Sequence, residues 1–227
     1  GIVLLQPHMS GAVVIAVGGI AVLFAAGFKL RYFFTTLLCG VPALLALAIG
    51  SPYRFKRITS FLDPFADRLG ESWQIVQSLY AIGSGGLFGL GLGKGQLRNI
   101  FAAAEDLVFG VVCEEFGMIM AGAILLSYIA LLVYSIRHSR YARSSFYAIC
   151  ACAAASLMLF QAALNVFGVN DILPLTGVTL PFVSNGGSSM LACGILAGFL
   201  KAGQANMFYL PPRPVNQPDM AVRRTNG

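Results

Sequence analysis

Long apolar runs dominate the chain, and short polar turns separate them. A helix needs about 20 mostly apolar residues to cross a hydrocarbon core about 30 Å thick. Runs of this kind predict five spans, at residues 11–28, 32–50, 107–136, 145–168 and 187–206. The sequence therefore predicts an all-α fold, a polytopic membrane helix bundle with about five transmembrane helices.

Basic residues predict how these spans are oriented. Lys29 and Arg31 separate the first two spans, and Arg137, Arg140 and Arg143 separate the third from the fourth. Cytoplasmic turns carry an excess of Lys and Arg. We therefore expect these turns and the C-terminus to be cytoplasmic. The exterior segments are then residues 1–10, 51–106 and 169–186.

The exterior segment 51–106 is too long to be expected without structure of its own. It contains an amphipathic stretch, WQIVQSLYAI, followed by GSGGLFGLGLGKG. We expect a helix or helical hairpin that lies in the outer interface or re-enters the membrane, because glycine-rich backbone is tolerated at that depth when it packs against protein. Gly85 with Gly89, and Gly91 with Gly95, have the spacing of close packing and not that of a phosphate loop.

Composition narrows the functional classes. The chain is 57% hydrophobic and 11% charged, with a net charge of +6. Because most Lys and Arg lie on the predicted cytoplasmic side, membrane orientation explains this charge more simply than nucleic-acid binding does. The five cysteines lie in or beside apolar segments without ligand spacing, which argues against a disulfide framework or zinc site. We expect a membrane domain at residues 1–206, a disordered cytoplasmic tail at 207–227, and an N-terminal truncation.

Four of the nine acidic residues lie within eleven positions: Glu105, Asp106, Glu114 and Glu115. At 1.5 Å per residue, Glu114 lies about 12 Å along a helix from Asp106, so a surface position for Asp106 places Glu114 in the upper third of the bilayer. Glu114 and Glu115 then either pair with basic residues to hold the bundle or line a polar cavity. For Asp106, a role at the helix N-terminus competes with catalysis.

The basic exterior loop and Asp106 together indicate group transfer. Arg and Lys bind phosphate and diphosphate groups, and the candidates in this loop are Arg54, Arg57, Lys94 and Arg98. A carboxylate within reach of a substrate hydroxyl takes its proton as that oxygen attacks an electrophilic carbon. We therefore expect transfer from a donor whose leaving group is a lipid-linked phosphate.

Five stretches resemble the SEDS family (FtsW, RodA and SpoVE) in order and spacing. They are LLQPHMSGA, YRFKRITSFLDPFAD, WQIVQSLYAIGSGGLFGLGLG, EDLVFGVVCEEFG and LPLTGVTLPFVSNGGSSM, and together they cover the chain up to about residue 206. The resemblance implies the C-terminal half of a multi-pass glycosyltransferase of the bacterial plasma membrane. Such an enzyme polymerises lipid II into peptidoglycan strands in division, elongation or sporulation, with a class B penicillin-binding protein as partner.

The resemblance also implies site residues. The essential Asp of the family pattern P-E-x-x-T-D-F falls on Asp106, which would deprotonate the 4-hydroxyl of the acceptor sugar. Phe101 and Ala102 stand where the family has Pro-Glu, and Glu105 stands where it has Thr. Glu105 is thus a candidate substitute for the missing Glu. Asn185 replaces a Tyr of the family.

Other candidate contacts keep two interpretations. Asn185, Ser188 and Ser189 lie where an exterior loop enters the last helix, so they either bind an anion or start and pack the helix. Glu114 and Glu115 are further candidate substrate contacts. We expect no metal held by protein ligands, although a divalent cation such as Mg²⁺ or Mn²⁺ is a candidate to offset the diphosphate. The alternative functions are a transporter (flippase) of the lipid-linked precursor and a non-catalytic scaffold for a penicillin-binding protein.

Overall fold

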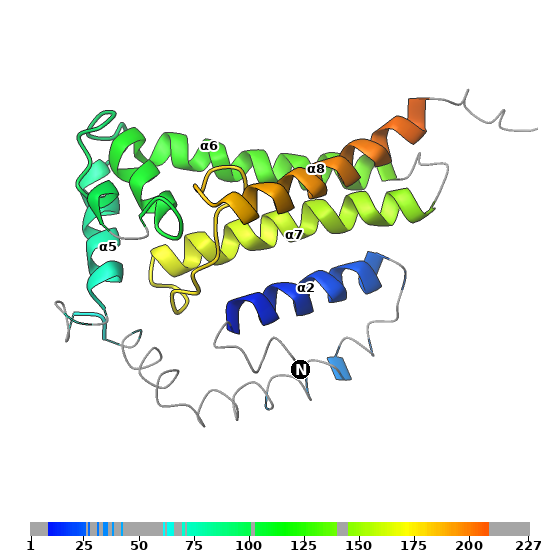
Figure 1. Cartoon of the computed structure of the whole chain (residues 1–227), viewed down its shortest axis with the longest axis horizontal. Helices are drawn as coiled ribbons and strands as arrows, with labels where there is room; N and C mark the ends of the chain where they lie inside the picture. The colour runs from blue at the N-terminus through cyan, green and yellow to red at the C-terminus, as the bar shows by residue number, and fades with distance from the viewer. Residues whose placement is uncertain are drawn as a thin grey trace, which may run out of the picture.

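The computed structural model describes residues 9–25, 72–100, 103–139 and 145–208, together with isolated positions between 27 and 70. Within these ranges the regular structure is helical and no strand occurs. The elements are α2 (Met9–Ala25), α5 (Trp73–Gly85), η1 (Leu97–Asn99), α6 (Val108–Ser139), α7 (Ser145–Val169) and α8 (Gly187–Phe208) (Figure 1).

Four long helices form a bundle. α7 packs against α2, α6 and α8, and α5 lies across one end of the bundle (Figure 1). The starts of α2, α6 and α8 and the end of α7 lie at this same end. This alternation agrees with the order of spans predicted from the basic turns. It also brings residues 72–107 and 170–186 to one end, although which end faces the exterior stays a prediction.

The predicted spans are helices wherever the structure describes them. α6 and α7 are long and apolar enough to cross a membrane, and α8 contains a shorter apolar helix at Gly187–Ala202. The predicted spans 11–28, 107–136, 145–168 and 187–206 correspond to α2, α6, α7 and α8. The predicted span 32–50 and the tail beyond residue 208 lie outside the described residues, except for a few single positions.

Small side chains on α7 allow its neighbours to approach closely. Ala154 and Ala155 are buried beside Met158, and Leu200 of α8 and Leu131 of α6 pack against this cluster. On the other side of α7, a Cβ added to Gly18 of α2 would lie 3.3 Å from the side chain of Leu157. Small residues of this kind are typical of helix contacts within membranes, where packing holds helices together.

Gly117 interrupts α6. Its φ of 82° and ψ of 174° are not helical, so the helix consists of a short part before Gly117 and a long part after it. We predicted a continuous span from 107 to 136, and that continuity is wrong. One glycine within an apolar run carries no recognisable signal for a break, because the partner that stabilises the break lies elsewhere in the chain.

The glycine-rich segment after α5 supplies hydrogen bonds at this break. The N–H groups of Leu90 and Gly91 donate to the carbonyls of Glu114 and Glu115, at 2.8 and 3.1 Å. In the opposite direction, Met118 N–H donates to the Gly86 carbonyl at 3.0 Å. Backbone polar groups freed within a helix must find such partners at membrane depth.

Glycines make this approach possible. An added Cβ at Gly85 would collide with the carbonyl of Cys113, and one at Gly89 with the carbonyl of Glu115. The predicted close packing of Gly85 and Gly89 is therefore confirmed. For Gly89 the packing is between a loop and a helix.

The short part of α6 lies beside α5 (Figure 1). Ser78 of α5 lies next to Gly110, and Gly85 lies next to Cys113, so the two segments run in the same direction. The Ser78 hydroxyl also donates to the Val169 carbonyl at 2.9 Å, which ties α5 to the end of α7. The membrane depth predicted for Glu114 required one straight helix from Asp106. Because the short part of α6 turns aside with α5, the distance along it does not measure membrane depth.

Gly117→Ala tests the break. The new Cβ would collide with the Leu87 carbonyl, and alanine disfavours a φ of 82°. We expect a loss of roughly 2 kcal/mol or more in the free energy of unfolding, measured by thermal unfolding in detergent.

Gly122→Ala is the matched control in the same helix, because an added Cβ there meets no atom within 4 Å. We expect this variant to be neutral or more stable by about 1 kcal/mol, since alanine favours the helix. Equal unfolding temperatures for the Gly117→Ala variant and the unmodified chain would contradict the role of the break.

Candidate catalytic site

Asp106 lies in the turn that precedes α6. Its side chain is half-buried, and the helix begins two residues later at Val108. Gly177, from the segment between α7 and α8, lies against the Asp106 carboxylate, because an added Cβ at Gly177 would be 3.2 Å from Asp106 Oδ2. Gly177 also has a φ of +67°, which glycine adopts without strain. A side chain at this position would be strained and would crowd the carboxylate.

Three consecutive carbonyls hold the turn to α7 and to the segment between α7 and α8. Asn185 N–H donates to the Ala104 carbonyl at 2.8 Å. The Ser184 hydroxyl donates to the Glu105 carbonyl at 2.6 Å and accepts from Leu180 N–H at 2.8 Å. The backbone on both sides of Glu105 is therefore fixed by residues about 80 positions further along the chain.

Asn165 makes the third connection. Its side chain projects from α7, the residue is 2% exposed, and its Nδ2 donates to the carbonyls of Asp106 at 2.8 Å and Val178 at 2.7 Å. Because both neighbours are acceptors, the amide nitrogen must face them. One buried amide thus sets the distance between the backbone of Asp106 and the segment that carries Gly177.

The segment between α7 and α8 is itself anchored. The Tyr128 hydroxyl, from the long part of α6, donates to the Pro181 carbonyl. Phe182, the next residue, has a φ of +61°, which is uncommon for an aromatic residue. The turn that carries the candidate base is therefore bonded to α7 and to the α7–α8 segment, and that segment is bonded to α6.

Glu114 and Glu115 form a second group, with Arg98 and the backbone of residues 95–97. The two Glu114 oxygens accept from the backbone N–H groups of Gln96, at 2.9 Å, and Leu97, at 3.0 Å. Glu115 is buried, and its Oε1 lies 4.0 Å from a nitrogen of Arg98, which is half exposed. Gly95 packs on the Glu114 carboxylate and on the Glu115 side-chain methylene.

This second group joins residues 95–98 to the break in α6. Of the two interpretations that the sequence left open, the contacts favour holding the structure together, although for Glu114 the partners are backbone amides and not basic side chains. Lys94 is exposed, and a substrate role for it and for Arg98 stays a prediction. Arg54 and Arg57 lie outside the described residues.

Two polar residues at the start of α8 make hydrogen bonds to backbone carbonyls. The Ser189 hydroxyl donates to the Gly186 carbonyl at 2.9 Å, and Asn185 contributes its backbone N–H to the Ala104 carbonyl. Ser188 and the Asn185 side chain are exposed. These contacts agree with a helix-start role for Ser189, and anion binding by Asn185 and Ser188 stays a prediction.

Among the described residues, no three His, Cys, Asp or Glu side chains come together as metal ligands. A divalent cation at the substrate diphosphate stays a prediction.

The sequence analysis missed Asn165, Ser184 and Gly177. One signal was present for Asn165, which with Gln161 is one of two amides within the apolar run of α7, since polar groups in such runs mark internal contacts. Ser184 and Gly177 lie inside the LPLTGVTLPFVSNGGSSM block, but their contacts with residues 105 and 106 depend on the fold.

Asn165→Leu tests the amide connection. Leucine has a similar size but no donor, so the carbonyls of Asp106 and Val178 lose their partner. We expect a loss of about 1–3 kcal/mol in the free energy of unfolding, measured by thermal unfolding in detergent.

Asn170→Leu serves as the control, because the Asn170 side chain donates a local hydrogen bond of 2.8 Å to the Val166 carbonyl, one turn earlier on α7. We expect that variant to lose no more than about 0.5 kcal/mol. If both variants lose the same stability, Asn165 is no more than a local helix contact.

The partly buried carboxyl of Asp171 predicts that the stability of the fold depends on pH. Its φ of +56° is left-handed, its Oδ1 is buried without a hydrogen-bond partner, and burial raises the pKa of the carboxyl above its ordinary value. A raised pKa means that the folded state binds this proton more readily than the unfolded chain does. The resulting stabilisation is present in acid and is lost as the pH rises through the raised pKa.

Asp171→Asn removes this charge and keeps a residue that tolerates a left-handed backbone. We therefore expect a larger rise in unfolding temperature at pH about 7 than just below the ordinary Asp pKa of about 4. A rise of the same size at both pH values would show that the charge of Asp171 does not affect folding.

Known proteins share this arrangement of sequence and fold. Residues 1–206 match the FtsW/RodA/SpoVE family model, described as cell cycle protein. Stage V sporulation protein E of Bacillus subtilis is 37% identical over 201 residues, which cover 86% of this chain and 55% of that protein. A probable peptidoglycan glycosyltransferase FtsW of Coxiella burnetii is 41% identical over 199 residues, 84% of this chain and 53% of that protein.

A solved structure extends the likeness to three dimensions. It comes from work on the structural coordination of polymerization and crosslinking by a peptidoglycan synthase complex, and its matching chain aligns with a TM-score of 0.67 and 28% identity. The match covers 87% of this chain and 56% of that one. The chain spans about half the length of the curated relatives it matches. With its family match over 1–206 and its helical membrane fold, the chain belongs to the FtsW/RodA/SpoVE family.

Proposed function

We propose that this chain is the C-terminal, base-carrying part of a peptidoglycan glycosyltransferase that polymerises lipid II at the outer face of the bacterial plasma membrane. The observation that carries the proposal is the half-buried Asp106 carboxylate on a turn whose three carbonyls are bonded to another segment. Relatives named as probable peptidoglycan glycosyltransferases support the reaction class.

Asp106 acts as the general base in this proposal. Its carboxylate takes the proton of the acceptor sugar's 4-hydroxyl while that oxygen attacks the anomeric carbon of the donor. The bond from the anomeric carbon to the diphosphate oxygen breaks, and undecaprenyl diphosphate leaves with the electron pair. Direct attack of this kind inverts the anomeric carbon. A fixed backbone at Asp106 favours the reaction because the base needs no reorientation.

Basic side chains offset the charge of the departing diphosphate. Lys94 and Arg98 are exposed and lie at the same end of the bundle as Asp106, and Arg54 and Arg57 are further candidates from the sequence. Their cationic groups suit a diphosphate through charge and forked hydrogen bonds. We propose the same partner that the resemblance implies, a class B penicillin-binding protein, and the similarity to a peptidoglycan synthase complex supports it.

The polymerase explains the contacts better than the two alternatives do. A transporter was suggested by Glu114 and Glu115, which would face a polar pathway. Both are buried, and Glu114 is occupied by two backbone amides. A scaffold would need no carboxylate held beside Gly177 at the mouth of the exterior loop.

Asp106→Asn in the full-length protein tests the proposal. An amide keeps the shape of the side chain but does not accept the proton, so we expect polymerisation to fall by about 10²- to 10⁴-fold. The measurement is the glycan ladder formed from labelled lipid II in detergent, where a transporter would make no polymer.

Glu105→Gln is the matched control, because Glu105 is the neighbouring carboxylate and its side chain is exposed. We expect this variant to make ladders like those of the unmodified enzyme. Normal ladders from the Asp106→Asn variant would remove Asp106 from the role of base, and loss of ladders only in the Glu105→Gln variant would transfer the role to Glu105.

A further inference from the structure

Four large apolar side chains project from the glycine-rich segment after α5. Leu87, Phe88, Leu90 and Leu92 are 62%, 82%, 44% and 78% exposed. We call these four residues the apolar ledge. Isolated apolar residues are common on protein surfaces, but four within six positions of one loop form a patch that requires an explanation.

The backbone of the ledge suits an apolar environment. Leu90 N–H donates to the Glu114 carbonyl and Gly89 N–H to the Gly85 carbonyl, both at 2.8 Å, while the Leu87 carbonyl accepts from Ile119 N–H. Loops facing water do not need such partners, because water supplies them. A loop in contact with lipid does need them, since an unsatisfied backbone group there costs several kcal/mol.

The ledge adjoins an exposed apolar surface of α6. The residues of α6 that follow the break are exposed and apolar, and they include Met118, Ile119 and Met120. Because Met118 and Ile119 donate to the carbonyls of Gly86 and Leu87, the ledge directly adjoins this face. α6 is long and apolar enough to cross a membrane, and most of its most apolar stretch is not buried within the protein.

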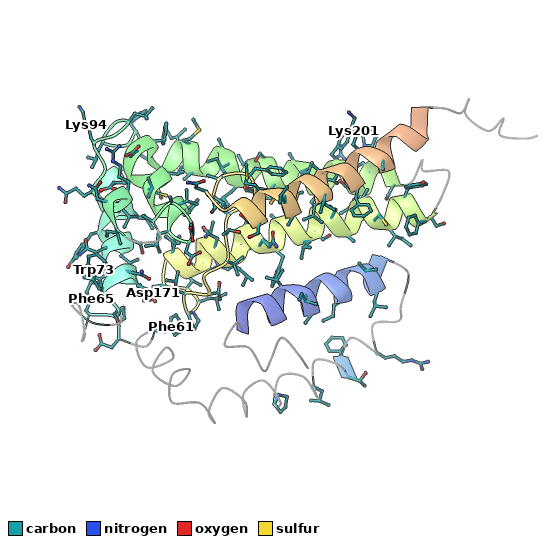
Figure 2. The ribbon with its side chains drawn as sticks, in the orientation of Figure 1. Phe61, Phe65, Trp73, Lys94, Asp171 and Lys201 are labelled. Carbon is teal, nitrogen blue, oxygen red and sulfur yellow. The ribbon has the colours of Figure 1, made fainter. Side chains whose placement is uncertain are left out.

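Basic residues follow the ledge. Lys94 is exposed. Figure 2 shows it at the α5 end of the bundle, on the side opposite Trp73 and Asp171. Arg98 is also half exposed. An apolar surface that ends in Lys and Arg matches the change from acyl chains to phosphate head groups, where long cationic side chains reach the interface.

We infer that the apolar ledge inserts into the bilayer leaflet at this end of the bundle, with Lys94 and Arg98 at the lipid phosphates. The sequence predicted a helix or helical hairpin in this segment that lies in the outer interface or re-enters the membrane. α5 turns Ile75, Val76 and Ala81 into the protein, and the inference assigns the lipid contact to the loop that follows α5. The ledge thereby links the break in α6 to the membrane surface. This inference does not depend on the proposed glycosyltransferase activity.

Phe88→Trp in a Trp73→Phe background tests the inference, because Trp73 is the only tryptophan of these 227 residues and Phe88 has room for a larger ring. The full-length protein, with any tryptophan outside these residues also replaced by phenylalanine, is reconstituted in phosphatidylcholine–phosphatidylglycerol vesicles, with or without lipids brominated in the upper acyl chain. We expect the brominated lipids to remove most of the emission and aqueous iodide to remove little. Leu92→Trp in the same background gives a second position on the ledge.

Ile172→Trp, also in the Trp73→Phe background, provides a comparison at an exposed position in the α7–α8 segment. We expect the two ledge variants to be quenched more strongly by brominated lipids than this one. Quenching of the ledge variants by iodide and not by brominated lipids would overturn the inference, since the ledge would then lie in water. Emission that neither reagent quenches would also overturn it, because the ledge would then be covered by a partner protein or a second copy.

Discussion

The structure depends on the exchange of backbone hydrogen bonds between the broken helix α6 and the glycine-rich segment after α5. Gly117 leaves the helical conformation, and the carbonyls of Glu114 and Glu115 then accept from Leu90 and Gly91. Without these partners, a break in an apolar helix would leave unsatisfied polar groups. With them, the short part of α6 lies along α5 and carries the preceding turn to the end of α7.

That placement sets up the candidate site. The turn before α6 meets the segment between α7 and α8, where three successive carbonyls accept from Asn185, Ser184 and Asn165. The Asp106 carboxylate is then held beside Gly177, half-buried and next to the exposed side chain of Glu105. A base held in this way requires little reorganisation when a proton moves, which is the usual contribution of a rigid scaffold to catalysis.

The sequence was sufficient for the spans, their alternation, the helix at α5 and the family, since apolar length and motif order are local properties. It also selected Asp106, through the resemblance. It did not reveal the break, because the Leu87 carbonyl that faces Gly117 comes from a distant part of the chain. It left the structural role of Glu114 as one of two alternatives and did not identify its partners, which are backbone amides that almost any residue would provide. Contacts between distant backbone groups leave no pattern in residue types.

The central claim is that Asp106, held by its neighbours on α7 and the α7–α8 segment, is the base that meets the acceptor sugar. The most direct measurement is a structure of the full-length protein with a non-reactive lipid II analogue as acceptor. If Asp106 is the base, one of its oxygens will lie about 3 Å from the acceptor's 4-hydroxyl, with the bonds from Asn165 and Ser184 retained. An acceptor hydroxyl bound against Glu105, Glu115 or another group, and out of reach of Asp106, would contradict it.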